Sequence, residues 1–519
     1  MNEHLENSVQ TTSENKPETY SGRIGDRSWT ISISLLIIAT LITIISQTVG
    51  DADLWGHLQF GMDILDSGTI TQVDPYSYMS AGYRWINHEW LAEVLFALLW
   101  RAGGSSGLII LKTLVGLFTF GSIYFYLINL NLSPIRAGSL IILASLAVIP
   151  AIATVRPHMF TLLFSVLTFL IISAAEYGKY KWLWLCPLVF ALWVNFHGGV
   201  LAGIGFLLIW AIIHTLLHRQ EWLKILIPTV VSVFAVLINP YGTDLITFLL
   251  ETATIPRPEI VEWQALQPVS ILGAIYFILL SIAILAVIFC KIEKRIPLLV
   301  LLAVAAIMPF VAVRHLPLFA FAVLIFGGPF IADAWLRFTK SSGSPSGLPR
   351  VVIVSILLLS FGLLIFSLRN FQTIKMPKSD PPFFPEKGVA ILDESEAKGN
   401  LATEFNWGEY AIWYLSPNIK VSMDGRRETV YSEEKYQIYN SFVYGINNWD
   451  SLLDDFDTNI VLIARYGPVY NLLKLKGGWE LVYEDATSAL FVSKENSHIA
   501  RIKEAISNLT EFEDDGIFP

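Results

Sequence analysis

Long apolar runs recur up to about residue 370, and many of them can cross the hydrocarbon core of a bilayer. The chain has 519 residues, is 54% hydrophobic and only 15% charged, and its mean hydropathy is +0.55. A water-soluble protein of this size carries far more surface charge, so the bilayer is the expected solvent for much of the chain. We expect about eleven membrane-spanning helices, near residues 29–50, 105–129, 136–154, 157–175, 182–197, 199–217, 222–239, 269–290, 297–313, 316–337 and 351–370.

Lysine and arginine are unevenly shared between the two sides of these predicted spans. If the N-terminus lies inside, the segments on the cytoplasmic side hold most of the basic residues up to the last span. Cytoplasmic loops are the ones enriched in lysine and arginine. The bias therefore predicts an integral protein of the plasma or inner membrane, with a cytoplasmic N-terminus. An odd number of spans then places the C-terminal segment on the exoplasmic side.

The composition divides the chain into four parts. Residues 1–28 are polar and predict a disordered cytoplasmic tail. Residues 29–370 predict a transmembrane bundle with an exoplasmic loop at 51–104, and the first apolar run is interpreted as an uncleaved signal anchor. Residues 371–505 have the composition of a soluble domain, and residues 506–519 form an acidic tail.

Short apolar runs in residues 371–505 indicate an exoplasmic α/β domain. The runs at Asn459–Ile463 and Ala489–Val492 predict strands, whereas Pro468–Leu475 and Trp449–Phe456 predict helices. The predicted fold class is therefore an α-helical polytopic membrane bundle followed by a small soluble α/β domain.

The net charge and the cysteine content exclude some functions. A net charge of −9 argues against a nucleic-acid partner, which would require a basic surface. The two cysteines, Cys186 and Cys290, both lie in apolar runs. They cannot form a disulfide framework or a cysteine-based zinc site.

The segment from Asp51 to Glu93 follows the first predicted span directly. Apolar residues at helical spacing after Asp53 predict a short helix in the membrane interface. Asp53 and His57 are four residues apart and share one face of that helix. A second interfacial helix is predicted at Glu89–Arg101, with Glu89 and Glu93 one turn apart.

Two interpretations of Asp51 and Asp53 remain open at this point. Aspartate is a favoured N-cap, and either residue could simply cap the interfacial helix, with Asp53 the better cap. Alternatively, a carboxylate at the membrane surface could act as a catalytic base.

Further polar groups fall on the same predicted side of the bundle. A charge near the bilayer usually faces a cavity or a partner, although arginine can also extend to lipid headgroups and histidine can be satisfied locally. Gly198 and Gly199, which follow Asn195 and His197, could serve only to form a tight link in the chain. These groups are Arg156, His158, Asn195, His197, Arg314 and His315.

Several stretches of the chain resemble the GT-C glycosyltransferase superfamily, most closely its bacterial protein mannosyltransferase-like and RgtA/B/C/D-like members. The stretches are DADLWGHLQFG, DPYSYMSAGYRWINHEWLAE, TVRPHMFTLLF, WVNFHGGVLAG and NPYG, and the likeness covers about residues 29–330. Members keep a catalytic acidic residue in the first loop, a role that falls by position on Asp51 or Asp53. Later loops lack the second acidic pair that some members use for metal. The resemblance therefore implies no certain cofactor and leaves a divalent metal open.

The resemblance implies transfer of a sugar from a polyprenyl-phosphate donor to a hydroxyl acceptor. The acceptor would be a glycan, lipid or protein, in cell-envelope glycan synthesis or in protein or lipid glycosylation, with membrane lipids around the bundle. One base and cations at the departing phosphate fit an inverting reaction. The expected substrate-binding residues are His57, Arg84, His88, Glu89, Arg156, His158, Asn195, His197, Arg314 and His315.

Two other functions remain open. A transporter or flippase for lipid-linked glycans would also have many spans, although the predicted spans lack acids at their centres. A non-catalytic membrane assembly protein would act through its C-terminal domain. In that domain, Asn406–Tyr410 and Met423–Arg427 either contact an acceptor or form a turn with an ion pair that holds the fold.

Overall fold

The computed structural model describes residues 21–253, 255, 260–339, 350–377, 379, 381–508 and 517–518. Most of the predicted tail at 1–28 and of the predicted acidic tail at 506–519 lies outside the described residues. Residues 21–28, which the sequence assigns to the disordered tail, form the first turns of helix α1.

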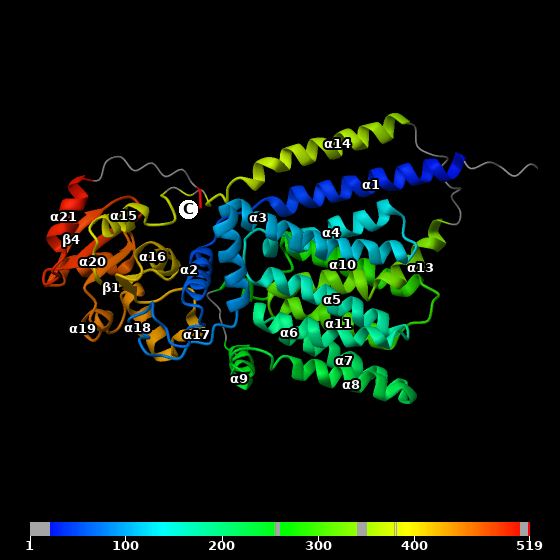
Figure 1. Cartoon of the computed structure of the whole chain (residues 1–519), viewed down its shortest axis with the longest axis horizontal. Coiled ribbons are helices and arrows are strands. Elements are labelled where there is room, and N and C mark those ends of the chain that lie inside the picture. Colours follow the sequence, from blue (N-terminus) through cyan, green and yellow to red (C-terminus); the bar gives the residue numbers. More distant parts are fainter. Residues whose placement is uncertain are drawn as a thin grey trace, which may run out of the picture.

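A helical bundle and a smaller sheet-containing domain lie side by side along the long axis of the molecule (Figure 1). The bundle helices run roughly along that axis, whereas α2 and α9 lie at the end nearest the smaller domain. The bundle region comprises α1 (Ser21–Ser46), α2 (Ala52–Ser67), α3 (Trp90–Asn129), α4 (Pro134–Ile152), α5 (His158–Glu176), α6 (Cys186–Phe196), α7 (Val200–Leu217), α8 (Trp222–Ala235), α9 (Thr243–Thr252), α10 (Ile271–Phe289), α11 (Ile296–Ile307), α12 (Leu316–Ile325), α13 (Gly328–Thr339) and α14 (Arg350–Leu368).

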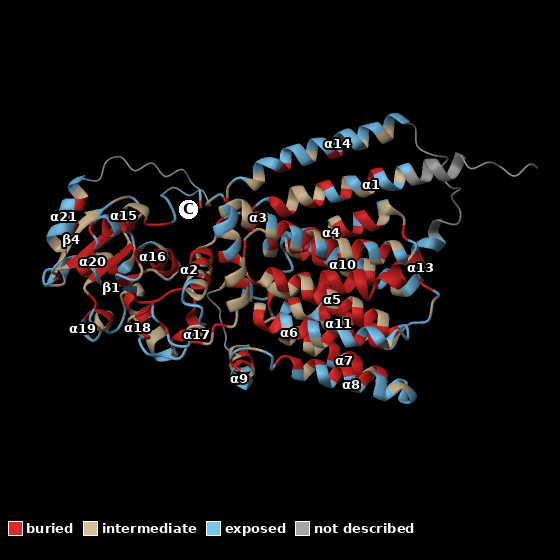
Figure 2. Cartoon of the chain, viewed as in Figure 1, coloured by how far each residue is buried: buried red, intermediate tan, exposed pale blue. Residues whose placement is uncertain are grey.

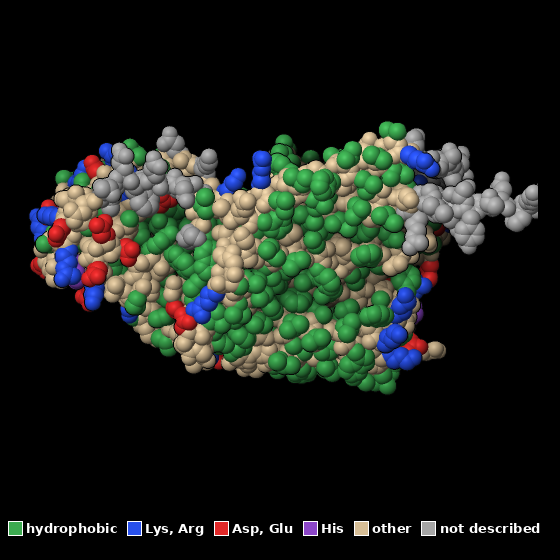
Figure 3. All heavy atoms as spheres, turned by 45° about the horizontal axis from the view of Figure 1, so that its top comes forward, with side chains coloured by type: hydrophobic (Ala, Val, Ile, Leu, Met, Phe, Trp, Pro, Cys, Tyr) green, Lys and Arg blue, Asp and Glu red, His purple; other side chains and the backbone are tan. Residues whose placement is uncertain are grey.

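Seven helices in the described part of the chain are long and apolar enough to cross a membrane. The number rises to eight if the bent pair Val313–Ile325 and Gly328–Arg337 is a single span. Shorter apolar helices at Tyr180–Phe196 and Ile296–Phe310, together with α8, coincide with three further predicted spans. The polytopic bundle is thus confirmed, whereas eleven crossings are not shown. Figure 3 shows hydrophobic side chains over most of the visible bundle surface.

Helix α3 unites the predicted second interfacial helix with the span that follows it. Two residues inside it leave helical geometry: Gly103 has φ −158° and ψ 15°, and Gly104 has φ 55° and ψ −142°. A positive φ is readily adopted by glycine alone, so this pair permits the change of direction between the two parts. The sequence therefore placed both parts but did not show their continuity.

The C-terminal domain is built on a five-stranded mixed sheet with the strand order β2-β1-β3-β5-β4. β1 pairs in parallel with β2 and β3, and β5 pairs antiparallel with β3 and β4. The predicted strands at 459–463 and 489–492 match β3 and β5. Its elements are α15 (Glu386–Glu394), β1 (Gly399–Thr403), α16 (Gly408–Leu415), β2 (Ile419–Val421), α17 (Arg427–Val430), α18 (Glu433–Tyr444), α19 (Ser451–Asp454), β3 (Ile460–Ala464), α20 (Pro468–Leu475), β4 (Trp479–Glu484), β5 (Ser488–Ser493) and α21 (Ile499–Asn508).

Helix α2 is buried on two sides, between the bundle and the C-terminal domain. It packs against α3 and α16, and Figure 2 shows buried residues on the facing parts of α2 and α16. The Trp55 ring lies 4.7 Å from Phe384, 5.0 Å from Tyr410 and 4.9 Å from Phe518, between ring centroids. The sequence pattern of α2 predicts a helix that lies on the membrane surface with one apolar face down. In the structure, α2 also packs against the C-terminal domain.

The loop after α2 extends the sheet of the C-terminal domain. Backbone hydrogen bonds join Tyr78 N–H to the Val421 carbonyl at 3.1 Å and Val421 N–H to the Tyr76 carbonyl at 3.0 Å. Nearby, the Arg426 guanidinium contacts Asp74 at 2.9 Å and Asp424 at 2.7 Å. All three side chains are buried, so this network fixes the domain to the loop. It matches the ion-pair interpretation of the Met423–Arg427 motif.

Basic side chains gather at the end of the bundle away from the C-terminal domain (Figure 3). Contacts at that end join segments far apart in the sequence: the Arg295 guanidinium lies 5.2 Å from the centroid of the Tyr177 ring, and that of Arg136 lies 5.5 Å from the Trp335 ring. The segments predicted to be cytoplasmic thus share one end. Which side of a membrane each end faces stays a prediction.

Candidate active site

A cavity of about 1020 Å³ lies where the bundle meets the C-terminal domain. Its walls come from the loops at one end of the bundle, from α2, and from α16 to α18 of the domain. Ten of the twelve predicted site residues line it, namely Asp51, Asp53, His57, His88, Glu89, Arg156, His158, His197, Arg314 and His315.

The other two predicted residues do not occur among the described residues that line this cavity. The exposed Arg84 side chain pairs with Asp244 at 2.5 Å. Asn195 is buried and accepts a hydrogen bond from Trp90 Nε1 at 2.9 Å, while its amide donates to the Ile238 carbonyl at 2.7 Å. The structure therefore gives both side chains partners within the chain.

Asp51 and Asp53 flank the guanidinium of Arg156. Arg156 Nη2 lies 2.7 Å from Asp51 Oδ2 and 2.9 Å from Asp53 Oδ2. This pairing follows from the chain path, because Val49 N–H donates to the Ala153 carbonyl at 2.9 Å and holds the segments before Asp51 and Arg156 together. One guanidinium thus forms ion pairs with two carboxylates.

The two aspartates have different roles at the start of α2. Asp51 is the N-cap, and its Oδ1 accepts from Asp53 N–H at 3.0 Å. Asp53, which looked the better cap from the sequence, instead lies in the first turn of the helix. Its side chain is 33% exposed, against 10% for Asp51. Burial and the neighbouring Asp53 raise the pKa of Asp51. Asp53 is therefore the more accessible carboxylate.

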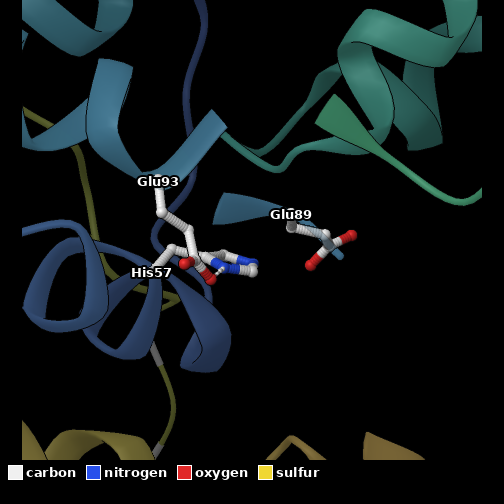
Figure 4. Close-up of side chains that lie close together, drawn as sticks. All are labelled: His57, Glu89 and Glu93. Carbon is white, nitrogen blue, oxygen red and sulfur yellow. Dashed lines mark hydrogen bonds and ion pairs between the residues drawn. The ribbon is translucent and has the colours of Figure 1, made fainter. Parts of the chain in front are cut away.

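His57, Glu89 and Glu93 lie close together (Figure 4). His57 Nδ1 lies 3.2 Å from Glu93 Oε1, and Asn87 Nδ2 donates to the other oxygen of Glu93. Burial opposes a charge on the His57 ring, but the hydrogen bond to Glu93 raises the pKa of His57. In Figure 4 the Glu89 carboxylate faces the histidine from the opposite side.

This triad has the donor types of a divalent-metal site. One ligand atom from each of His57, Glu89 and Glu93 lies within 4.8 Å of the other two. An imidazole and two carboxylates suit zinc and other first-row metals. Burial, aided by the neighbouring Glu93, raises the pKa of Glu89 to about 7. A metal ion would favour the ionised carboxylate, so the residues fit such a group.

His197 and His88 approach Glu89 from the cavity side. His197 Nε2 lies 3.5 Å and His88 Nε2 3.6 Å from Glu89 Oε1. Gly199 N–H donates to His197 Nδ1 at 2.9 Å, so that nitrogen is an acceptor and the ring proton lies on Nε2, toward Glu89. Burial and Arg314 lower the pKa of His197 well below its ordinary value. His197 is therefore a neutral donor.

Arg314 forms a second cationic group of the cavity. Its Nη1 lies 3.5 Å from Glu262 Oε1, and its guanidinium lies 4.4 Å from the centroid of the Trp263 ring. Its side chain is partly exposed. His315 Nδ1 lies 3.2 Å from the Met308 carbonyl, and His158 Nε2 contacts the Ala151 carbonyl. Both histidines therefore have local partners, whereas Arg314 faces the cavity and, among the described residues, forms an ion pair with Glu262.

The C-terminal domain adds cavity residues that the sequence did not identify as site residues. Glu409 is buried against α2, and Arg427 stacks on the Tyr436 ring with 3.6 Å between guanidinium and centroid. Glu409 lies in the motif Asn406–Tyr410. From the sequence, this motif could be either an acceptor contact or a turn. Its place beside α2 depends on a contact across more than 350 residues of chain.

No protein-family model matches the chain, and no curated protein matches it by sequence. Several solved structures share its fold. Archaeal oligosaccharyltransferase AglB from Archaeoglobus fulgidus, in complex with an inhibitory peptide and a dolichol-phosphate, has a TM-score of 0.53 at 12% identity, over 90% of this chain and 74% of that one. The A. fulgidus oligosaccharyltransferase complex with Zn and sulfate has a TM-score of 0.51 at 11% identity, over 83% and 68%.

ArnT from Cupriavidus metallidurans, in the apo state, has a TM-score of 0.51 at 11% identity. The match covers 93% of this chain and 99% of ArnT. The chain therefore has the architecture of the GT-C membrane glycosyltransferases, which confirms the predicted resemblance at the level of the fold. At such low identity the likeness carries no further conclusion about the reaction.

Proposed function

We propose that this chain is an integral-membrane glycosyltransferase that moves a sugar from a polyprenyl-phosphate donor to a hydroxyl acceptor on the exoplasmic side. The observation that carries the proposal is the accessible carboxylate of Asp53, paired with Arg156 and facing a cavity between the membrane bundle and a soluble domain. Such a cavity gives a lipid-linked donor and a water-soluble acceptor access to the same group. The fold likeness to AglB and ArnT agrees with this assignment.

Asp53 is the proposed general base for an inverting transfer. It takes the proton of the acceptor hydroxyl while the hydroxyl oxygen bonds to the sugar carbon, and the phosphate departs with the electrons of the broken bond. Arg156 holds the Asp53 carboxylate in position through their 2.9 Å contact. Asp51 caps the same helix and helps to hold the pair of Asp53 and Arg156 in place.

Arg314 is the proposed partner of the departing phosphate. Because Arg156 already contacts two carboxylates, Arg314 is better placed to accept a second anionic partner. A guanidinium binds phosphate oxygens in pairs. His197, a neutral donor near Arg314, can add a hydrogen bond. AglB was solved with a dolichol-phosphate, which agrees with this class of donor.

His57, Glu89 and Glu93 are the residues that would hold a divalent metal. The related archaeal enzyme has been solved with Zn and sulfate. A bound cation would supply positive charge near a phosphate group.

The proposal is tested with purified full-length protein and a panel of polyprenyl-phosphate sugars in detergent micelles. Release of free polyprenyl phosphate, by transfer or hydrolysis, is the expected result. A flippase would instead move labelled donor across a vesicle bilayer and leave the donor intact. That outcome, with no phosphate released from any donor of the panel, would contradict the proposed function.

A further inference from the structure

Glu409 brings a third carboxyl next to Asp53. It lies in the first turn of α16, its side chain is buried with 4% of the residue exposed, and its Oε2 makes no hydrogen bond to any described residue. It also lines the cavity. A buried carboxyl without a partner is costly unless it carries a proton or meets a ligand. The mechanism above does not use Glu409.

Two glycines make room for this carboxyl. A Cβ atom on Gly56 of α2 would lie 2.2 Å from Glu409 Oε2. A Cβ atom on Gly425 would lie 2.7 Å from Glu409 Oε1 and 3.0 Å from Asp53 Oδ1. Both carboxylates therefore flank the same glycine, and any side chain at either glycine would displace Glu409. The packing is specific to an acid reaching α2 from the C-terminal domain.

The charges that face Glu409 favour its neutral form. Burial raises the pKa of Glu409 well above its ordinary value, and the nearby Asp53 and Asp424 raise it further. Asp51 acts in the same direction, and Arg426 opposes it. Arg426, however, is already shared between Asp424 and a second buried aspartate of the loop.

Arg156 is the other nearby cation, and it also has two acidic partners. Its contacts with Asp51 and Asp53 leave one positive charge between two carboxylates. An ionised Glu409 would therefore add a buried negative charge beside two cations that each already contact two acids. A buried carboxyl in this position avoids that cost by holding a proton.

We propose that Glu409 is a neutral carboxylic acid in the resting protein and lies beside Asp53, so that the C-terminal domain supplies a positioning residue for the catalytic base. The effect on catalysis rests on the function proposed above, whereas the protonation state does not. A neutral Glu409 would add no negative charge beside Asp53 and would leave the contact of Asp53 with Arg156 intact. The domain is then part of the reaction centre, beyond any role in holding the acceptor.

Infrared difference spectroscopy of the full-length protein at pH 7 tests the protonation state directly. Glu409→Gln should remove one carbonyl band of a protonated carboxylic acid. The matched control Glu434→Gln, at an exposed glutamate of α18, should leave that carbonyl band in place. Loss of an ionised band in Glu409→Gln would overturn the proposal, whether or not the protein transfers sugar.

Gly56→Ala provides a second spectroscopic test. The added methyl should displace the Glu409 carboxyl and shift its band, while Gly121→Ala, at a helix glycine with open space around it, should leave the band unchanged. An unchanged band in folded Gly56→Ala would show that Glu409 does not occupy the position described.

The pH profile of polyprenyl phosphate release tests the role in catalysis. Because glutamine stays neutral, Glu409→Gln should keep activity within about threefold of wild type at pH 7 and lose the alkaline decline that ionisation of Glu409 causes. A residue with only a structural role would change the rate without changing the profile. An unchanged profile, or loss of activity at every pH, would contradict the positioning role.

Discussion

Arg156 Nη2 lies 2.7 Å from Asp51 Oδ2 and 2.9 Å from Asp53 Oδ2, so a single guanidinium joins the two aspartates at the start of α2. The contact links a helix N-terminus to the segment between α4 and α5, and it faces the cavity shared with the C-terminal domain. The direct partners of Arg156 are therefore the two aspartates. We therefore propose that Arg156 acts on the proposed base and does not bind the phosphate directly.

Replacing Arg156 by glutamine should slow transfer and move its acidic limb to higher pH. Arg156 lowers the pKa of Asp51, so its removal lets the pKa of that carboxyl rise further. We expect kcat to fall about tenfold or more at pH 6 and less at pH 8. The measurement is a pH profile of polyprenyl phosphate release. A uniform loss at all pH values would contradict this role.

Replacing Arg314 by glutamine should weaken donor binding. The lost guanidinium removes the proposed phosphate contact, and KM for the donor should rise about tenfold or more. The matched control is Arg101→Gln, whose exposed side chain pairs with Asp66 on the outer face of the loop. Equal KM values for the two variants in steady-state kinetics would remove Arg314 from the donor site.

Zinc or another divalent metal should bind the triad, and Glu89→Gln should lower its affinity about tenfold or more. Burial raises the pKa of Glu89 to about 7, so affinity should fall as the pH drops below 7, where Glu89 is protonated and cannot ligate. Calorimetric titration of chelator-treated protein at pH 6 and pH 8 measures both effects. Equal affinity of wild type and Glu89→Gln would place the metal elsewhere.

Lys112→Met should destabilise the bundle beneath the aspartates. Lys112 is 2% exposed, and its Nζ donates to the Gln47 carbonyl at 2.7 Å and the Ile152 carbonyl at 3.0 Å, at the C-terminal ends of α1 and α4. Leaving these carbonyls unpaired should cost about 1–3 kcal/mol. Thermal unfolding should show a lower Tm than for Lys420→Met, the same change at an exposed residue of β2.

An unchanged Tm for Lys112→Met would mean that water replaces the ammonium at these carbonyls. In the sequence, Lys112 is a single charge within an apolar run. The sequence could not show that this ammonium turns inward to the ends of two helices, because apolar periodicity does not identify the partners of a single charge.

The parts that the sequence predicted well depend on local pattern. Long apolar runs give helices wherever they occur, and strands such as β3 and β5 follow from short runs of branched residues. The number of spans was less certain, because helices such as α8 and α11 are too short to count by length alone. The proximity of His57 to Glu89 could be predicted from the sequence, because both residues flank the same predicted loop.

The parts that were missed depend on contacts between distant segments. Nothing in the apolar spacing of α2 indicates that Trp55 packs against Phe384 of the C-terminal region. The ion pair between Asp74 and Arg426 likewise joins two segments far apart in the chain. Neither segment alone indicates that the other is its partner. The available signal was a glycine, because Gly56 leaves room on α2 for the Glu409 carboxyl.

The most direct test of the account is the rate of polyprenyl phosphate release by Asp53→Asn, compared with Asp66→Asn in the same helix. Asp66 is exposed and pairs with Arg101 away from the cavity, so the same chemical change there should leave the rate near wild type. Asp53→Asn should lose about a hundredfold or more, with normal expression and Tm. A folded Asp53→Asn protein that releases phosphate at the rate of Asp66→Asn would contradict the central claim.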